Sequence, residues 1–234
     1  MSSLDLRCKA LNNIPPKKLE EKLNSINTSN DDFNKKQLKS VAINRYAESN
    51  IPIEYWNLSM EKDFKGDAKL LKYYQDYVNN LKDNYLKGTS ICFAGNHGRG
   101  KSFAATSILK KACQKGYNCQ YNNLSDIVNV LTQASSEDKF IARRELCMVD
   151  FLVIDEFDSR FMQSENAAEL YARTLEVIFR TRAQNKLPTL MCTNSPNIIE
   201  AFDGPLKDSI QSLMTGYLKI FPVFGDDYRK KINI

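Results

Sequence analysis

The eight residues from Gly95 to Ser102 constrain the fold more than any other stretch of this sequence. They read Gly-Asn-His-Gly-Arg-Gly-Lys-Ser and match the pattern G-x-x-x-x-G-K-[ST] at every fixed position. An apolar run over 91–94 precedes them and a helical pattern over 101–115 follows, which is the context that a phosphate-binding loop requires. Glycines let such a loop bend until several backbone N–H groups point at one anion, and the helix dipole adds positive potential. We therefore expect a nucleotide-phosphate site here rather than a chance glycine-rich turn.

The residue types in this loop predict individual roles. Lys101 is expected to reach the β and γ phosphates of ATP, and the Ser102 hydroxyl is expected to ligate Mg²⁺. His97, the only histidine of the chain, is expected to be an exposed loop residue rather than a catalyst. The residues expected to contact the nucleotide are Gly95, Asn96, His97, Gly98, Arg99, Gly100, Lys101, Ser102 and Phe103.

Two further apolar runs end in polar side chains. Residues 151–154 lead into Asp155 and Glu156, and residues 189–193 lead into Asn194. Adjacent carboxylates at the end of a buried strand are unfavourable unless cations or water meet them. In P-loop ATPases the first carboxylate holds Mg²⁺ and the second polarises water, so we predict Asp155 as a metal ligand and Glu156 as the general base. Asn194 can orient water without adding charge, or it can cap the turn that follows.

Short apolar runs alternate with helical patterns along most of the chain. The runs cover 91–94, 120–122, 151–155, 189–193 and 217–221, and helical patterns cover 101–115, 125–133 and 167–184. Strands that are apolar on both faces and alternate with helices are typical of a parallel sheet covered on both sides. We predict an α/β ATPase core over 45–234, with an earlier helix from about Leu70 to Gly88, and a polar N-terminal segment and linker over 1–44.

Composition excludes several other classes of protein. The formal net charge of +5 permits a polyanionic partner without establishing one. No apolar run approaches the roughly 18 residues of a membrane helix, and the first residues lack the apolar core of a signal peptide. Six cysteines without a CxxC pair, and a single histidine, disfavour a disulfide framework and a zinc site. These features predict a cytoplasmic protein with reduced thiols and no membrane segment.

The three polar strand ends, in this order, resemble the AAA+ ATPases and more narrowly the DnaC-type and IstB-type helicase-loader family. The resemblance covers about residues 41–234. Its most similar segments are 45–52, 121–127, 149–156, 187–194 and 225–229. It implies a five-stranded sheet of order 5-1-4-3-2, no C-terminal lid domain, binding of ATP and Mg²⁺, and a homo-oligomer. It further implies that the N-terminal region docks on a replicative DnaB-type helicase, and that the assembly loads this helicase on single-stranded DNA.

One position departs from the family pattern. The arginine finger, which stabilises transition-state charge in a neighbour's site, aligns with Ser212, and a serine cannot replace that cation. Lys207, Arg180 and Arg182 are possible substitutes, although the two arginines end a long amphipathic helix and are expected to be solvated. Arg229 resembles a phosphate contact of the family. We therefore expect nucleotide binding with weak or partner-dependent hydrolysis.

Candidate DNA contacts are Arg143, Arg144 and Arg160, which are expected in loops on either side of the 151–155 strand. Arg143 and Arg144 could instead belong to a charged helix face. Basic groups of this kind can follow the phosphates of a single strand.

Three alternatives to a helicase loader remain open at this point. A transposition ATPase of the IstB type would coat duplex DNA, and a nucleotide-switched adaptor would bind ATP with little hydrolysis. A small-molecule kinase fits less well, because Glu156 beside Asp155 suits attack by water.

Overall fold

The computed structural model describes residues 37–158, 165–195, 207–208, 211 and 217–228, with the backbone alone described for 165–174. The chain divides into two units, Met1–Asn44 and Arg45–Ile234. Residues 37–48 are helical. All features discussed below belong to the second unit.

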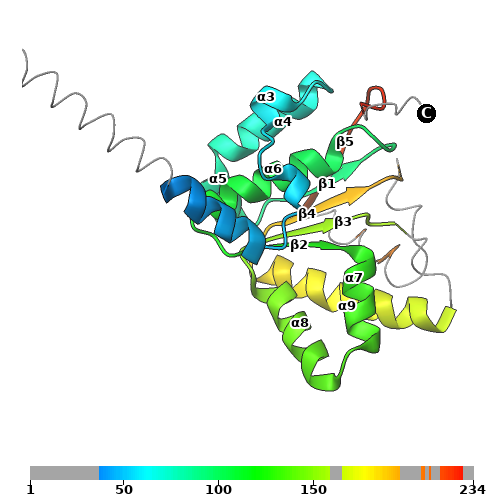
Figure 1. Ribbon diagram of the computed structural model, residues 1–234. Helices are drawn as coiled ribbons and strands as arrows, with labels where there is room; N and C mark the ends of the chain where they lie inside the picture. Colours follow the sequence, from blue (N-terminus) through cyan, green and yellow to red (C-terminus); the bar gives the residue numbers. More distant parts are fainter. Residues whose placement is uncertain (1–36, 159–164, 196–206, 209–210, 212–216, 229–234) are drawn as a thin grey trace, which may run out of the picture. The chain divides into compact units, whose positions relative to one another are not determined.

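Five parallel strands form one sheet at the centre of this unit (Figure 1). They are β1 (Ser90–Ala94), β2 (Cys119–Asn123), β3 (Phe151–Asp155), β4 (Thr189–Thr193) and β5 (Leu218–Pro222). Every neighbouring pair is parallel, and the order is β2-β3-β4-β1-β5. Counted from the β5 edge this is 5-1-4-3-2, so the predicted fold class and strand order are confirmed.

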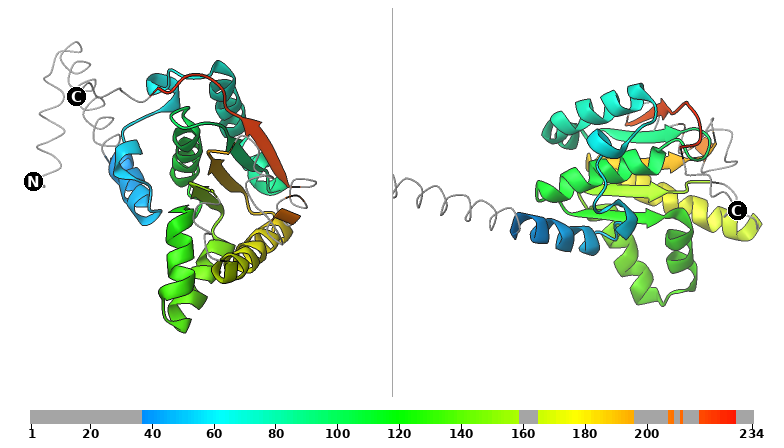
Figure 2. Two further views of the ribbon diagram at one scale, coloured as in Figure 1. Left: turned by 90° about the vertical axis from the view of Figure 1, so that its right-hand side faces the viewer. Right: turned by 45° about the horizontal axis from the view of Figure 1, so that its top comes forward.

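Helices cover both faces of the sheet. They are η1 (Ile53–Tyr55), α3 (Met60–Asp63), α4 (Ala68–Asn79), α5 (Leu81–Lys87), α6 (Lys101–Gln114), α7 (Leu124–Gln133), α8 (Ser136–Met148) and α9 (Glu165–Gln184). Helices α3 to α6 lie on one side of the sheet and α7 to α9 on the other (Figure 1, Figure 2). No helix in the described part of the chain combines the length and the apolar character needed to cross a membrane.

The three helices predicted after the P-loop are confirmed, whereas the helix predicted from Leu70 to Gly88 is two helices. The break lies at Asn80, whose backbone has left the helical region and whose amide donates to the carbonyl oxygen of Asp76 (2.9 Å). Gly88 ends the second helix in the left-handed conformation that favours glycine. Helix α8 was not predicted, because its apolar residues do not form a buried stripe.

The core lies between the sheet and each helical layer. Strands β1, β3 and β4 are buried along their whole length, as expected for central strands covered on both sides. On one face α6 packs through buried small and aliphatic side chains, namely Ala104, Ala105, Ile108, Leu109 and Ala112. On the other face the side chains of α7, α8 and α9 form a single apolar cluster with Cys92, Leu152, Ile154 and Met191.

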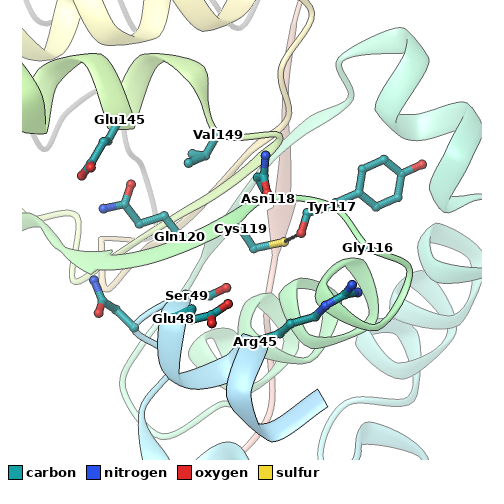
Figure 3. A pocket seen from close by; sticks show the side chains of 11 residues that line it. Arg45, Glu48, Ser49, Gly116, Tyr117, Asn118, Cys119, Gln120, Glu145 and Val149 are labelled. Atoms are coloured by element: carbon teal, nitrogen blue, oxygen red, sulfur yellow. Dashed lines mark hydrogen bonds between the residues drawn. The ribbon is translucent and has the colours of Figure 1, made fainter. Parts of the chain in front are cut away.

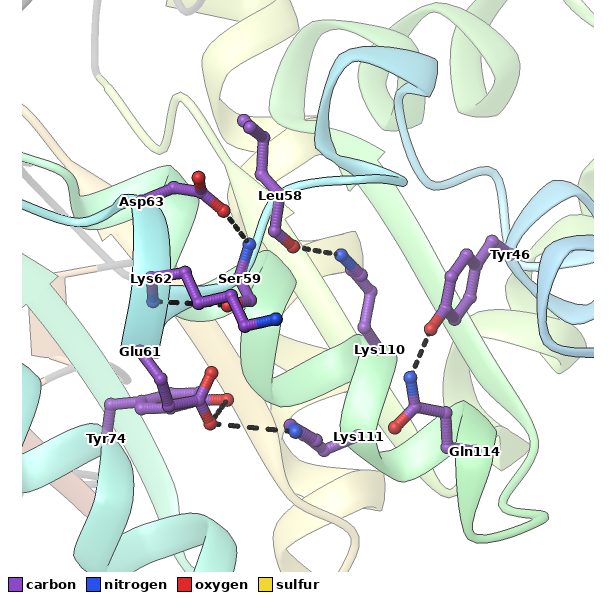
Figure 4. Close-up of polar contacts among 10 residues, drawn as sticks. All are labelled: Tyr46, Leu58, Ser59, Glu61, Lys62, Asp63, Tyr74, Lys110, Lys111 and Gln114. Atoms are coloured by element: carbon purple, nitrogen blue, oxygen red, sulfur yellow. Dashed lines mark hydrogen bonds and ion pairs between the residues drawn. The ribbon is translucent and has the colours of Figure 1, made fainter. Parts of the chain in front are cut away.

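Helix α6 also fastens the segment that precedes the sheet (Figure 4). Lys110 is 7% exposed, and its ammonium donates to the carbonyl oxygens of Tyr55 (2.6 Å) and Leu58 (2.5 Å). It also lies 5.5 Å from the centre of the Tyr46 ring. Burial lowers the pKa of Lys110. The helix that begins with Lys101 is therefore tied to the N-terminal part of this unit.

Arg182 lies within the protein, which corrects the expectation that it is solvated. Its side chain is 1% exposed, and burial lowers its pKa to about 10. The guanidinium donates to Thr189 Oγ1 (2.9 Å) and to the carbonyl oxygens of Leu146, Val149 and Pro188 (2.8 Å each) and Asp150 (3.5 Å). Arg182 thus joins the end of α8 to the starts of β3 and β4, and it is not available as a substitute arginine finger.

Candidate functional site

The loop between β1 and α6 has the conformation that a phosphate-binding loop needs. Gly98 and Gly100 adopt positive φ angles of 72° and 86°. A Cβ atom at Gly98 would collide with the Asp227 carboxylate, and one at Gly100 would collide with the ring of Phe64. Both positions therefore require glycine for backbone conformation and for space. The N-cap of α6 is Gly100, which has no side chain of its own to cap the helix. The first N–H groups of this helix can therefore meet an anion.

Lys101 and Ser102 occupy the first turn of α6, directly behind the loop. Lys101 is 5% exposed, and its ammonium donates to the carbonyl oxygen of Asn96 within the same loop (2.7 Å). The Ser102 hydroxyl donates to Asp155 Oδ1 (3.1 Å). Because the hydroxyl hydrogen points at Asp155, the oxygen lone pairs of Ser102 face elsewhere and can meet a cation.

Asp155 ends β3 and lies at the centre of the cluster. It is 6% exposed, and Oδ1 accepts from Ser102 Oγ and from the backbone N–H of Glu156 (2.8 Å). Its other oxygen, Oδ2, accepts from the hydroxyl of Tyr121 on β2 (2.7 Å). The thiol of Cys192 on β4 is also adjacent, and burial, followed by the charge of Asp155, raises its pKa well above the usual value. Two residues predicted as Mg²⁺ ligands, Ser102 and Asp155, thus lie in contact.

These two residues offer oxygen atoms alone, which suits a hard cation. Mg²⁺ is usually bound by one or two protein oxygens together with phosphate oxygens and waters, rather than by a full protein cage. Among the described residues no group of three or more His, Cys, Asp or Glu side chains could hold a metal ion. The donor set therefore fits Mg²⁺ that arrives with a nucleotide.

Glu156 and Asn194 lie at the same carboxyl edge of the sheet. Glu156 is exposed and has a positive φ of 51°, which is uncommon for a residue with a side chain. It is held between buried Asp155 and buried Phe157, whose N–H donates to the carbonyl oxygen of Cys192 (2.8 Å). Asn194 follows β4, the strand between β3 and β1, so the topology places it between the carboxylates and the loop.

The alternative role of Asn194, as a cap of the turn that follows, concerns a segment that continues beyond the described residues. The turn after β4 is closed by Thr193, whose Oγ1 accepts from the N–H of Ser195 (3.1 Å). Asn194 is half-buried. Both roles of Asn194 therefore stay predictions.

The other loop residues point outward or hold the chain that follows β5. Asn96 and His97 are exposed, as expected for His97. Arg99 donates to the carbonyl oxygen of Val223 (3.2 Å), and the carbonyl oxygen of Gly98 accepts from the N–H of Tyr228 (3.0 Å). The segment 223–228 is thus fastened to the loop, a contact that the sequence did not predict.

Aromatic rings lie beside the start of α6. Phe103 is half-buried, stacks on Tyr55 with ring centres 6.0 Å apart, and meets the edge of Phe64 at 6.2 Å. Of these, only Phe103 was predicted as a site residue. Tyr55 and Phe64 precede the loop by more than thirty positions, and no local motif marks them.

Several predicted residues lie outside this cluster. Arg229, Ser212 and Arg160 fall outside the described residues. Arg180 is exposed and pairs with Glu176 of its own helix (2.8 Å), while Lys207 is half-buried. Arg143 and Arg144 are exposed on helix α8 and do not lie in a loop, which corrects that part of the prediction.

A cavity of about 560 Å³ lies away from the motif residues (Figure 3). It is lined by Arg45, Glu48, Ser49, Asn50, Gly116, Tyr117, Asn118, Cys119, Gln120, Glu145 and Val149. Asn118 and Val149 precede β2 and β3, so the cavity lies at the amino edge of the parallel sheet, opposite to Asp155. None of the predicted nucleotide ligands that the structure describes lines it.

A parallel sheet of this order, with a phosphate-binding loop after β1 and a carboxylate at the end of β3, defines an AAA+ type of P-loop nucleotide-binding core. The family of IstB-like ATP-binding proteins matches residues 76–232, and the chain belongs to this family. A comparison with curated proteins found no match.

Solved structures with the same fold include the DnaC helicase loader, DnaI and the replication initiator DnaA. The DnaC helicase loader is 17% identical with a TM-score of 0.60, over 74% of this chain and 100% of that chain. DnaI is 15% identical with a TM-score of 0.60, and the match covers 76% of this chain and 94% of DnaI. AMPPCP-bound DnaA from Aquifex aeolicus is 18% identical with a TM-score of 0.59, and the match covers 75% of this chain and 52% of the DnaA chain. The chain spans about half the length of two DnaA structures and of a DNA replication initiation factor that it matches. At these identities the likeness concerns the fold.

Proposed function

We propose that this protein is an ATPase that loads a replicative DnaB-type helicase onto single-stranded DNA during replication initiation. The observation that carries the proposal is the contact between Ser102 and Asp155 directly behind a phosphate-binding loop. This arrangement suits Mg²⁺–ATP, and family membership supports ATP binding. The fold shared with DnaC over the full length of that structure supports the loader role.

Each residue of the cluster has a defined part in this proposal. Lys101 leaves the carbonyl oxygen of Asn96 and binds the β and γ phosphates, while Ser102 and Asp155 hold Mg²⁺. A Mg²⁺ ion held by these two residues would supply positive charge against the phosphate oxygens. Glu156 takes a proton from the attacking water, and Asn194 orients that water. Arg229 adds a phosphate contact.

The proposed partners follow from the family resemblance and from the surface. Segment 1–44 docks on the helicase, and copies of the core assemble so that single-stranded DNA follows a basic surface. Arg143 and Arg144 are exposed on one turn of α8 and are the candidate phosphate contacts, together with Arg160. Hydrolysis is weak or partner-dependent, because Ser212 replaces the arginine finger and Arg182 is committed to the core.

The family match also favours a second candidate, a transposition ATPase that acts on duplex DNA. A nucleotide-switched adaptor with little hydrolysis is a third, suggested by Ser212. Preference for single-stranded over duplex DNA separates the first two candidates. Single-turnover hydrolysis with and without helicase separates the loader from the adaptor.

The decisive experiment is a pull-down with a purified DnaB-type helicase. We expect capture by the wild-type protein with ATP and much weaker capture by the Lys101→Ala variant. Removal of residues 1–44 should abolish capture while ATP binding by the core persists. Absence of any helicase interaction, with or without ATP, would refute the loader role.

A further inference from the structure

Tyr121 contacts the proposed metal ligand from the side opposite to the nucleotide loop. The two oxygens of Asp155 are divided between different donors. Oδ1 accepts from Ser102 Oγ (3.1 Å) and the N–H of Glu156 (2.8 Å), whereas Oδ2 accepts from the Tyr121 hydroxyl (2.7 Å). The contact between Tyr121 and Asp155 is the shortest of the three, and it comes from the neighbouring strand.

The position of the Tyr121 hydroxyl is fixed by its surroundings. Tyr121 pairs with Val153 in the parallel ladder between β2 and β3. On the outer edge of β2 its N–H donates to the carbonyl oxygen of Ser49 (2.8 Å). The residue is 8% exposed. Its backbone is therefore held from both sides of the strand, so the phenol approaches Asp155 from a defined direction.

A carboxylate that binds a cation must present a lone pair in the right direction, and a free carboxylate rotates about its last bond. Hydrogen bonds to the oxygen that does not face the cation restrict this rotation, and they contribute strongly to metal affinity. We propose that Tyr121 is a positioning residue that orients Asp155 for Mg²⁺–nucleotide. This inference rests on the proposed nucleotide-binding function.

The competing explanation is that the Tyr121 hydroxyl only satisfies a buried carboxylate and so contributes to stability. The two explanations differ in what they predict for Mg²⁺. A stability contribution lowers the melting temperature and leaves the response to Mg²⁺ unchanged. A positioning role changes the Mg²⁺ concentration at which the nucleotide is bound tightly.

The test compares Tyr121→Phe with Tyr77→Phe. Tyr77 is a matched control, since it is also a buried tyrosine and its hydroxyl makes a short bond to the carbonyl oxygen of Thr89 (2.8 Å). The Tyr121 hydroxyl likewise makes one short bond, to Asp155, and lies 3.5 Å from Asn123 Oδ1. Affinity for a fluorescent ATP analogue is measured in EDTA and then over a range of Mg²⁺ concentrations, with thermal unfolding recorded for each variant. Asp155→Asn marks the response expected when the ligand itself is lost.

In EDTA we expect Tyr121→Phe, Tyr77→Phe and the wild type to bind the analogue equally. With Mg²⁺ we expect Tyr121→Phe to need roughly 10-fold more of the cation for half of the gain in affinity, as is usual when a residue that supports a metal ligand is removed. Tyr77→Phe should respond as the wild type does. Equal Mg²⁺ responses of the two variants would overturn the positioning role and leave nucleotide binding intact. Failure of the wild type to bind the analogue at all would overturn the proposed function itself.

Discussion

The polar side chains at the two edges of the sheet differ in the contacts that they make. At the amino edge, Arg182 donates to five acceptors that belong to α8 and to the starts of β3 and β4. At the carboxyl edge, the Lys101 ammonium donates to a carbonyl oxygen of its own loop, the N-cap of α6 is a glycine, and Glu156 is exposed. A cation whose donors are matched by distant parts of the chain stabilises the fold. The groups at the carboxyl edge instead lie in the phosphate-binding loop or reach solvent, where a ligand can meet them.

The largest effect on stability is expected at the amino edge. Arg182→Met removes the guanidinium and leaves several carbonyl oxygens without a donor, so the free energy of unfolding should fall by about 4 kcal/mol. Chemical denaturation with urea measures the change. A free energy of unfolding within about 1 kcal/mol of the wild-type value would contradict this prediction. It would mean that water replaces the guanidinium and that the contacts of Arg182 do not hold the amino edge together.

At the carboxyl edge the largest expected effect is on catalysis. Glu156→Gln keeps the size of the side chain and removes the base, so single-turnover hydrolysis should fall at least about 100-fold, as is typical for general base catalysis. Affinity for ATP and stability should stay close to the wild-type values, since the side chain is exposed. Rapid-quench measurement in the presence of helicase checks the rate. An unchanged rate would remove Glu156 from the mechanism.

The next effect, in size, concerns nucleotide affinity. Lys101→Ala removes a charge-assisted contact to phosphate, which is worth about 2 kcal/mol, so affinity for Mg²⁺–ATP should fall on the order of 30-fold. We expect the fold to tolerate this change, because the ammonium donates to a carbonyl oxygen of its own loop. Isothermal titration gives the affinity and thermal unfolding gives the stability. A large loss of stability with little loss of affinity would place Lys101 with Arg182 and contradict the distinction between the edges.

The sequence predicted the polar residues of the carboxyl edge, but it did not predict those of the amino edge. The P-loop and the Asp155–Glu156 pair are contiguous motifs, and apolar runs marked all five strands. Tyr121 was missed because its contact with Asp155 arises from strand pairing 34 positions away in the chain. Arg182 was misjudged because its main partners are backbone carbonyl oxygens, which leave no trace in residue types.

The sequence predicted those helices whose buried apolar residues recur at regular helical spacing. Helix α8 was missed because Phe140 and Ile141 are exposed, so its pattern does not resemble a helix packed on a core. The break at Asn80 was missed because Leu81 continues the apolar spacing of α4 and is buried as expected. Hydrophobic periodicity therefore predicts buried faces better than it predicts helix ends.

Lys110 gives the most selective test of this comparison, because it is the same residue type on the same helix as Lys101. The effect expected for it is also the smallest. Like Arg182, it donates to carbonyl oxygens of a distant segment, those of Tyr55 and Leu58. Lys110→Met keeps the apolar stem, so we expect a loss of about 1.5 kcal/mol in the free energy of unfolding, since desolvation of the ammonium offsets part of the two hydrogen bonds.

Affinity of the Lys110→Met variant for Mg²⁺–ATP should remain within about 2-fold of the wild type, because the ammonium lies nearly three helical turns from the loop. The urea and titration measurements used for Arg182 and Lys101 apply without change. If affinity falls as far as it does for Lys101→Ala, then the attachment of the 55–58 segment to α6 controls the nucleotide site. In that case, the hydrogen-bond acceptors of a buried cation would not tell whether it serves the fold or the nucleotide site.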